Sequence, residues 1–254
     1  GLATAKVVGE LGGDVVVMDV QDPLEPAGEF VRVDLTHRES IDSALSTAGA
    51  FDAVFSCAGV AEGTPGIAEI NFVGQRHLIE SMLASGSVRA DGAIAMISSI
   101  GGTGWEDQVE LINDLLAAPS FEEGSEWFAA RPELANYTFT KQAVIGYCAA
   151  RAPELGREGL RINATAPGPV LTPLMAAEET WQMFEAGFKD AMGVAGAQAV
   201  QQAYPLAFLC SDAASYVNGH CLVVDGGLTT GSSPGDPPYA QPQPFMAEAG
   251  KTGI

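Results

Sequence analysis

The segment Asn136-Tyr137-Thr138-Phe139-Thr140-Lys141 places a phenol and an ammonium four residues apart. On a helix, residues i and i+4 share a face, so Tyr137 and Lys141 would project side by side. A cation beside a phenol favours the phenolate and lowers a pKa that is ordinarily near ~10. Such a tyrosine can act as an acid or base near neutral pH. The spacing alone is also typical of a solvated helix face, so its meaning depends on the rest of the chain.

Outward from this pair, short β-rich segments alternate with helical patterns. Upstream, the apolar run Ala93-Ile94-Ala95-Met96-Ile97 ends in the double serine Ser98-Ser99. The alternation predicts an α/β fold, a Rossmann-type doubly wound parallel sheet in a single domain with helices on both faces. Strands are expected at 14–20, 30–33, 53–57, 93–98, 161–166 and 220–224, and helices at 2–11, 40–48, 66–84, 137–152 and 198–209.

Composition narrows the class of protein. The 254 residues suit one domain with a large core. A formal net charge of -20 argues against nucleic acid or an anionic membrane as a partner. No apolar stretch reaches membrane-spanning length and no secretory signal opens the chain, which favours a soluble, cytoplasmic protein. Reduced thiols, rather than disulfides or a metal site, are expected at Cys57, Cys148, Cys210 and Cys221.

Four segments depart from the regular alternation. The chain opens directly on a helix, so we expect the first strand and most of the glycine turn of a doubly wound sheet to be absent, with Gly1 as the last glycine of that turn. The loss of this central strand would leave two neighbouring strands without backbone partners. Residues 101–134 form an acidic insertion, 174–202 an apolar lid or an ordinary amphipathic helix, and 229–254 a proline-rich tail.

Several polar or small residues follow the expected strands. Asp19 ends the 14–20 strand, where a dinucleotide fold bonds the adenosine ribose or where an aspartate simply caps a turn. Asp34-Leu35 follows the next strand and could meet an adenine edge. Cys57-Ala58-Gly59 would let the backbone approach a cofactor or would form a plain strand-to-loop turn. Asn71 lies among apolar residues in the 66–84 helix, so its amide either staples backbone groups or holds a water.

Later in the chain, Pro167-Gly168 forms a turn on the rim where open α/β sheets bind ligands. Thr172 could bond a carboxamide or cap the helix that follows. The last expected strand closes on Asp225-Gly226-Gly227.

Together, these pieces resemble the short-chain dehydrogenases/reductases over nearly the whole chain and in family order. The resemblance implies a catalytic tetrad that falls on Asn71, Ser99, Tyr137 and Lys141, and a cofactor site that falls on Gly1, Asp19, Asp34, Leu35, Cys57, Ala58, Gly59, Tyr137, Lys141, Pro167, Gly168 and Thr172. The 101–134 insertion and Cys-Ala-Gly are similar to the subgroup of bacterial 3α-hydroxysteroid dehydrogenase/carbonyl reductases and coniferyl-alcohol dehydrogenase-like proteins. The implied reaction is hydride transfer between NAD and an apolar secondary alcohol or ketone, in a domain spanning 1–228 and without a metal.

Three alternatives remain open: an epimerase or dehydratase of the longer sister group, a non-catalytic NAD-binding relative, and an inactive fragment. The sister group needs a further substrate domain after Asp225-Gly226-Gly227. For assembly we expect a homodimer, because like charges on the insertion would oppose a four-helix contact there. These charges are Glu106, Asp107, Glu110, Asp114, Glu122, Glu123 and Glu126.

Overall fold

The computed structural model describes residues 1–172, 189 and 196–229. Within them, every strand pairing is parallel, which confirms the expected α/β class. The strands lie close to their expected positions, and the longest begins five residues earlier than the sequence indicated. The strands are β1 (Val16–Asp19), β2 (Glu29–Arg32), β3 (Phe51–Ser56), β4 (Val88–Ile97), β5 (Arg161–Pro167) and β6 (Cys221–Val224).

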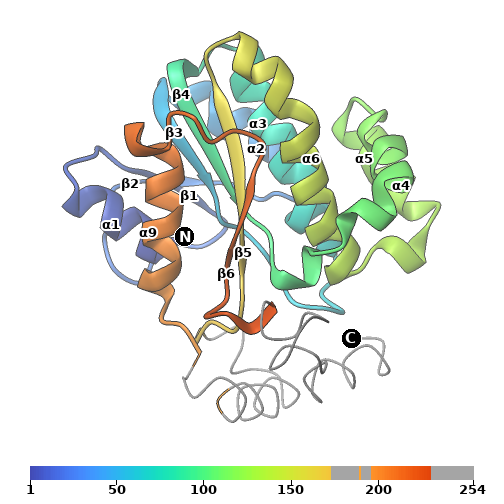
Figure 1. The fold of residues 1–254 in the computed structure, drawn as a ribbon. Helices are drawn as coiled ribbons and strands as arrows, with labels where there is room; N and C mark the ends of the chain where they lie inside the picture. Colours follow the sequence, from blue (N-terminus) through green and yellow to red (C-terminus); the bar gives the residue numbers. More distant parts are fainter. Residues whose placement is uncertain (173–188, 190–195, 230–254) are drawn as a thin grey trace.

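Helices cover both faces of the sheet, as Figure 1 shows. Helices α1 (Leu2–Glu10) and α9 (Ala199–Cys210) pack on one face, and α2 (Arg38–Thr47), α3 (Gly74–Ala84) and α6 (Tyr137–Arg157) on the other. Strand β4 illustrates the two-sided burial. Its Ile94 and Met96 enter the larger core with α3 and α6, whereas Ala95 between them packs against Leu206 and Leu209 of α9. Burial on both faces explains why this strand reads as a continuous apolar run.

The strands form two sheets rather than one. In the part of the chain that is described, β1 pairs only with β2, and β3 begins a four-stranded sheet in the order β3-β4-β5-β6. Strands β1 and β3 therefore each have one edge without a strand partner among these residues. The expectation that two strands would lack backbone partners is confirmed.

Most helix boundaries differ from the sequence prediction by one or two residues, and two differences have a clear structural cause. The 66–84 helix does not include Gly66, because this residue has a φ of 76° and lies in the left-handed region. The helix expected to stop at Ala152 continues through Pro153 to Arg157. A proline weakens a helix interior, but the burial of Leu155 in the larger core stabilises this last turn.

The 101–134 insertion is helical, as expected, and packs against α6. It contains the short helix η3 (Trp105–Gln108), then α4 (Val109–Leu116), α5 (Phe121–Ala129) and the short helix η4 (Pro132–Leu134). Gly146 of α6 permits close packing, because a Cβ there would lie 2.7 Å from Cγ2 of Ile112 on α4. On α5, Trp127 stacks on Phe139 of α6 with ring centroids 5.7 Å apart.

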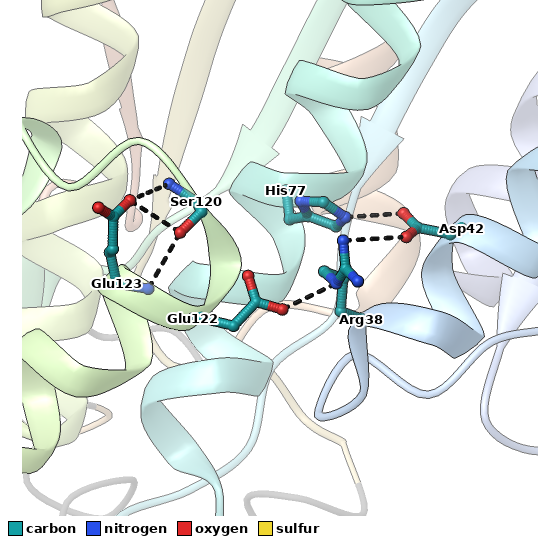
Figure 2. A network of polar contacts seen from close by, with 6 residues as sticks. All are labelled: Arg38, Asp42, His77, Ser120, Glu122 and Glu123. Carbon is teal, nitrogen blue, oxygen red and sulfur yellow. Dashed lines mark hydrogen bonds and ion pairs between the residues drawn. The ribbon is translucent and has the colours of Figure 1, made fainter.

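Polar contacts join the start of α5 to α2 and α3, as Figure 2 shows. Ser120 and Glu123 form a capping box that begins α5. Arg38 of α2 contacts Glu122 through Nε at 2.8 Å, and Asp42 of α2 bonds His77 of α3 at 2.8 Å. Exposed ion pairs contribute little individually, so the apolar contacts of Phe121 carry more of this docking.

No helix in the described part of the chain is long and apolar enough to cross a membrane. The four cysteines are free thiols, as expected. The predicted lid at 174–202 lies outside the described residues except for 189 and 196–202. Of the predicted tail, only residue 229 is described.

Candidate active site

The candidate site lies where the parallel strands end, because their carboxyl ends meet at one edge of each sheet. Asp19 ends β1, Cys57-Ala58-Gly59 follows β3, Ser98-Ser99 follows β4 and Pro167 ends β5. Gly1 lies beside this edge, since a Cβ built on it would be 3.7 Å from Cβ of Cys57.

Lys141 lies at the centre of the site and is 3% exposed. Its Nζ donates a hydrogen bond to the carbonyl of Ile97 at 3.1 Å and lies 5.7 Å from the centroid of the Tyr137 ring. Burial lowers the pKa of Lys141 to about 8, and the nearby Cys57 thiol opposes part of this effect. No carboxylate pairs with this ammonium among the described residues.

Tyr137 is the first residue of α6, and two side chains hold the start of this helix. The Asn136 side chain accepts a hydrogen bond from the Phe139 amide at 2.8 Å. Glu62, from the loop after β3, accepts one from the Tyr137 amide at 2.7 Å. A carboxylate at a helix N-terminus is favourable, and here it also ties two distant segments together. The half-buried Tyr137 is thus anchored through its own backbone.

The two serines play different structural roles. The Ser98 hydroxyl is buried and donates to the Lys141 carbonyl at 2.7 Å, which fastens the end of β4 to α6. The Ser99 Oγ accepts from the Gly101 amide at 3.1 Å. A Cβ built on Gly101 would lie 3.6 Å from this Oγ and 3.7 Å from Cε1 of Tyr137. Ser99 and Tyr137 therefore border the same small space, which Ser98 does not.

Asn71 lies in a π-helical turn, η1 (Glu69–Val73), and is fully buried. Its side chain accepts from the Val60 amide at 2.8 Å and donates to the Val60 carbonyl at 3.1 Å, so the expected backbone staple is present. Asn71 also donates to the Thr140 hydroxyl at 3.4 Å. The stapled loop brings Gly59 against Lys141, because a Cβ there would be 3.2 Å from Nζ. A glycine is needed for this approach.

Two of the side chains expected to hold a cofactor lie at the ends of β1 and β2. Asp19 is exposed and accepts from the Gln21 amide at 3.1 Å. Asp34 accepts from the amide and hydroxyl of Thr36 at 2.9 and 2.6 Å, and these bonds lower its pKa. The register places Arg32 of β2 directly opposite Asp19. No ion pair of Arg32 is found within the described ranges.

The turn after β5 is held against the end of β6. The Gly168 amide donates to the Val224 carbonyl at 3.1 Å. Asp225 accepts from the amides of Gly227 and Thr229 at 2.8 and 2.7 Å, and so closes the glycine turn.

Two further residues were expected to hold a cofactor. Thr172 is the last described residue before the gap in the described chain, and Leu35 contacts α3 at Gly74.

Asn71, Tyr137, Lys141, Gly59 and Ser99 therefore surround one small region, whereas Asp19 and Asp34 lie at the ends of the outer strands. Sequence reasoning missed Glu62, Gln75 and Thr140. Gln75 carried a usable signal, because it is an amide four residues after Asn71 on the same helical face. Glu62 carried none, since its contact spans 75 residues.

Known proteins resemble this chain over most of its length. A family model described as enoyl-(acyl carrier protein) reductase matches residues 126–229. The coniferyl-alcohol dehydrogenase of Pseudomonas sp. (strain HR199 / DSM 7063) is 32% identical over 91% of this chain and 92% of that protein. The cis-4-hydroxycyclohexanecarboxylate dehydrogenase of Sinomonas cyclohexanicum is 31% identical over 90% of this chain and 92% of that protein.

Among solved structures, the 3α-hydroxysteroid dehydrogenase from Pseudomonas sp. B-0831, complexed with NADH, has a TM-score of 0.74. It is 23% identical and covers 91% of this chain and 94% of that chain, which supports the fold alone. Membership of a family is shown instead by the sequence match to the coniferyl-alcohol dehydrogenase, which covers more than nine tenths of both chains. The resemblance in the motifs is confirmed, and the chain belongs to the short-chain dehydrogenase/reductase family.

Proposed function

We propose that this protein is an NAD-dependent dehydrogenase that interconverts an alcohol and the corresponding ketone or aldehyde. The observation that carries the proposal is the buried Lys141 ammonium, 5.7 Å from the ring of a Tyr137 that borders the same space as Ser99. Tyr137 takes the hydroxyl proton in oxidation and returns it in reduction. Lys141 favours the phenolate, and Ser99 holds the substrate oxygen while charge develops on it.

The residues present fit a dinucleotide at the strand ends. Gly59 leaves open the space beside Lys141 that a Cβ would fill. Lys141 would bond the nicotinamide ribose, and Asp19 the hydroxyls of the adenosine ribose. The loop 57–59, Pro167-Gly168 and Thr172 would line the nicotinamide side, and Asp34-Leu35 the adenine side. NAD, when bound, supplies the hydride acceptor. Asn71 would hold the loop at Val60 and so keep Gly59 beside Lys141.

Cofactor choice would depend on Asp19 and its neighbour Arg32. The Asp19 carboxylate accepts hydrogen bonds from ribose hydroxyls and repels a 2′-phosphate, so NAD is favoured by at least about tenfold. Because Arg32 lies opposite Asp19, Asp19→Ala should weaken NAD binding and strengthen NADP binding. The double variant Asp19→Ala/Arg32→Ala should lose the gain toward NADP. Equal use of both cofactors by the unaltered protein would contradict the role of Asp19.

For the substrate, we propose an apolar alcohol such as an aryl alcohol or a hydroxysteroid. The support is the relative that covers 91% of this chain, whose name describes a dehydrogenase of an aryl alcohol. NADH formation should be measured with coniferyl alcohol, a hydroxysteroid and a hydroxycyclohexanecarboxylate in parallel.

The decisive experiment is Tyr137→Phe, which removes the acid/base and keeps the ring. Turnover should fall by roughly 10²–10⁴-fold, while NADH affinity stays within a few-fold. The matched control is Tyr147→Phe on the same helix, where the hydroxyl bonds Glu80 at 2.8 Å. That variant should keep its turnover. Near-normal turnover in a folded Tyr137→Phe protein would contradict the proposal.

We also propose a homodimer formed through α9 and β6. Helix α9 has no charged residue in a chain with 32 acidic ones. Val200, Tyr204 and Phe208 recur every four residues along it and are 42%, 54% and 42% exposed. Val223 of β6, the outermost strand of its sheet, is 40% exposed. An uncharged apolar stripe at a sheet edge suits a second copy of the same chain.

A further inference from the structure

Gln75, in the second residue of α3, joins three parts of the site and has no part in the chemistry proposed above. It is 1% exposed. Its Oε1 accepts from the Ser56 hydroxyl, at the end of β3, at 2.6 Å. Its Nε2 donates to the carbonyls of Ala58, Ile70 and Asn71 at 3.0, 2.8 and 3.0 Å. One amide thus touches the end of β3, the loop that precedes Gly59 and the turn that carries Asn71.

The orientation of the Gln75 amide follows from its partners. Three carbonyl oxygens surround one end, and they can only accept, so the NH₂ group must face them. Two N–H groups serve three acceptors, so one hydrogen is shared between two of these carbonyls. The remaining oxygen then faces the Ser56 hydroxyl, which can donate. Each polar atom of this buried amide has a partner, as burial requires.

The π-helical turn explains why its carbonyl oxygens need hydrogen-bond donors from a side chain. The Gly74 amide bonds the Glu69 carbonyl, five residues back, instead of the carbonyl four residues back. The extra residue in this turn rotates the preceding side chains by about 100° relative to α3. Asn71 therefore points at Val60 and Thr140. Such a turn also disturbs the regular pairing of helix carbonyls, and the Gln75 amide bonds two of them.

We infer that Gln75 is a positioning residue: it locks the π-helical turn to the loop at Gly59, and so holds Asn71 at Val60 and sets Gly59 against Lys141. Gln75 holds the loop at Ala58, and Asn71 holds it at Val60, so Gly59 is clamped on both sides. The lysine ammonium needs this placement, because Gly59 lies in contact range of Nζ. The inference rests on the proposed dehydrogenase function for its kinetic consequences only.

The first test measures backbone protection and does not depend on activity. In Gln75→Met, which keeps size and removes the amide, hydrogen exchange at the Val60 amide should quicken by at least about tenfold. The matched control is Arg76→Met, whose guanidinium bonds the carbonyls of Leu115 and Leu116 at 3.3 and 3.1 Å. That variant should loosen α4 and leave Val60 protected. Unchanged Val60 protection in Gln75→Met, or equal loss in Arg76→Met, would overturn the inference.

The second test is a double-mutant cycle on turnover with Gln75→Met and Asn71→Ala. Gln75→Met should lower kcat by roughly tenfold to a hundredfold with KM for the alcohol changed less than threefold, because displaced catalytic groups affect chemistry more than substrate binding. The double variant should lose at most about threefold beyond the larger single loss, since Gln75 acts through Asn71. Additive losses would overturn the inference. If the unaltered protein oxidised no alcohol, the proposed function would fail, and the exchange measurement would still decide the role of Gln75.

Discussion

Replacing Lys141 by methionine tests the electrostatics of the site through folding stability alone. Burial lowers the pKa of Lys141 from 10.5 to about 8, so the folded protein releases this proton at a lower pH than the unfolded chain. Between these two values the unfolded chain binds more protons, and stability therefore rises with pH. Below pH 8 both states are protonated and the full penalty of burying the charge is present.

The magnitude follows from the pKa shift. At about 1.4 kcal/mol per unit, a lowering from 10.5 to about 8 corresponds to about 3 kcal/mol over the whole range. Between pH 7 and pH 9.5 about 2 kcal/mol of this should be recovered. The residue is 3% exposed, so solvent screens little of it. Lys141→Met has no such proton, so the wild type should gain about 2 kcal/mol relative to the variant over this interval.

The assay is urea unfolding of both proteins at several pH values, analysed as a difference. The difference is necessary because burial also raises the pKa of Cys210 and Cys221 to about 12, which makes the protein less stable as the unfolded thiols ionise. Those contributions cancel between the two proteins. Lys6→Met at the surface is the control for removing a charge. A flat difference between wild type and Lys141→Met from pH 7 to 9.5 would refute the reasoning.

Three further predictions concern the serines, the assembly and the insertion. Ser98→Ala should lower the free energy of unfolding by about 1 kcal/mol, because it removes the buried hydrogen bond from the Ser98 hydroxyl to the Lys141 carbonyl. Ser99→Ala should instead lower turnover with little loss of stability. If Ser98→Ala lowered turnover and Ser99→Ala lowered stability, the roles assigned to the two serines would be wrong. Tyr204→Glu should convert a dimeric mass to a monomeric one in light scattering, and an unchanged mass would exclude α9 from the interface. Gly146→Val should destabilise the fold by about 1–3 kcal/mol through its clash with Ile112, as measured by urea unfolding.

The order of strands and helices could be predicted from sequence because it depends on local patterns. The apolar run before Ser98-Ser99 and the i, i+4 spacing of Tyr137 and Lys141 are visible without any tertiary information. The division of the sheet between β1 and β3 followed from the order of elements in a doubly wound fold. Boundaries were less accurate where one residue acted through its tertiary neighbours, as Leu155 does beyond Pro153.

The contacts that hold the site together could not be predicted in this way. Glu62 bonds the Tyr137 amide across 75 residues, and no local pattern marks an exposed glutamate for this role. The difference between Ser98 and Ser99 depends on which hydroxyl faces the Lys141 carbonyl. Gln75 is an intermediate case, since a buried amide one helical turn after Asn71 suggests a polar contact but not its partners.

The burial of Lys141 links the stability of this protein to its proposed chemistry. An ammonium without a carboxylate partner in the described part of the chain destabilises the fold at neutral pH, and hydrophobic burial elsewhere must offset it. The same ammonium lies 5.7 Å from the Tyr137 ring, where an anion forms only when the phenol loses its proton. Phenolate formation would then satisfy the buried cation, so each charge favours the other. A carboxylate beside Lys141 would pair with the ammonium in the folded protein whether or not Tyr137 were ionised. The lysine would then no longer favour the phenolate. Under the proposed function, the lack of a carboxylate beside Lys141 among the described residues is therefore what would let the lysine act on the tyrosine.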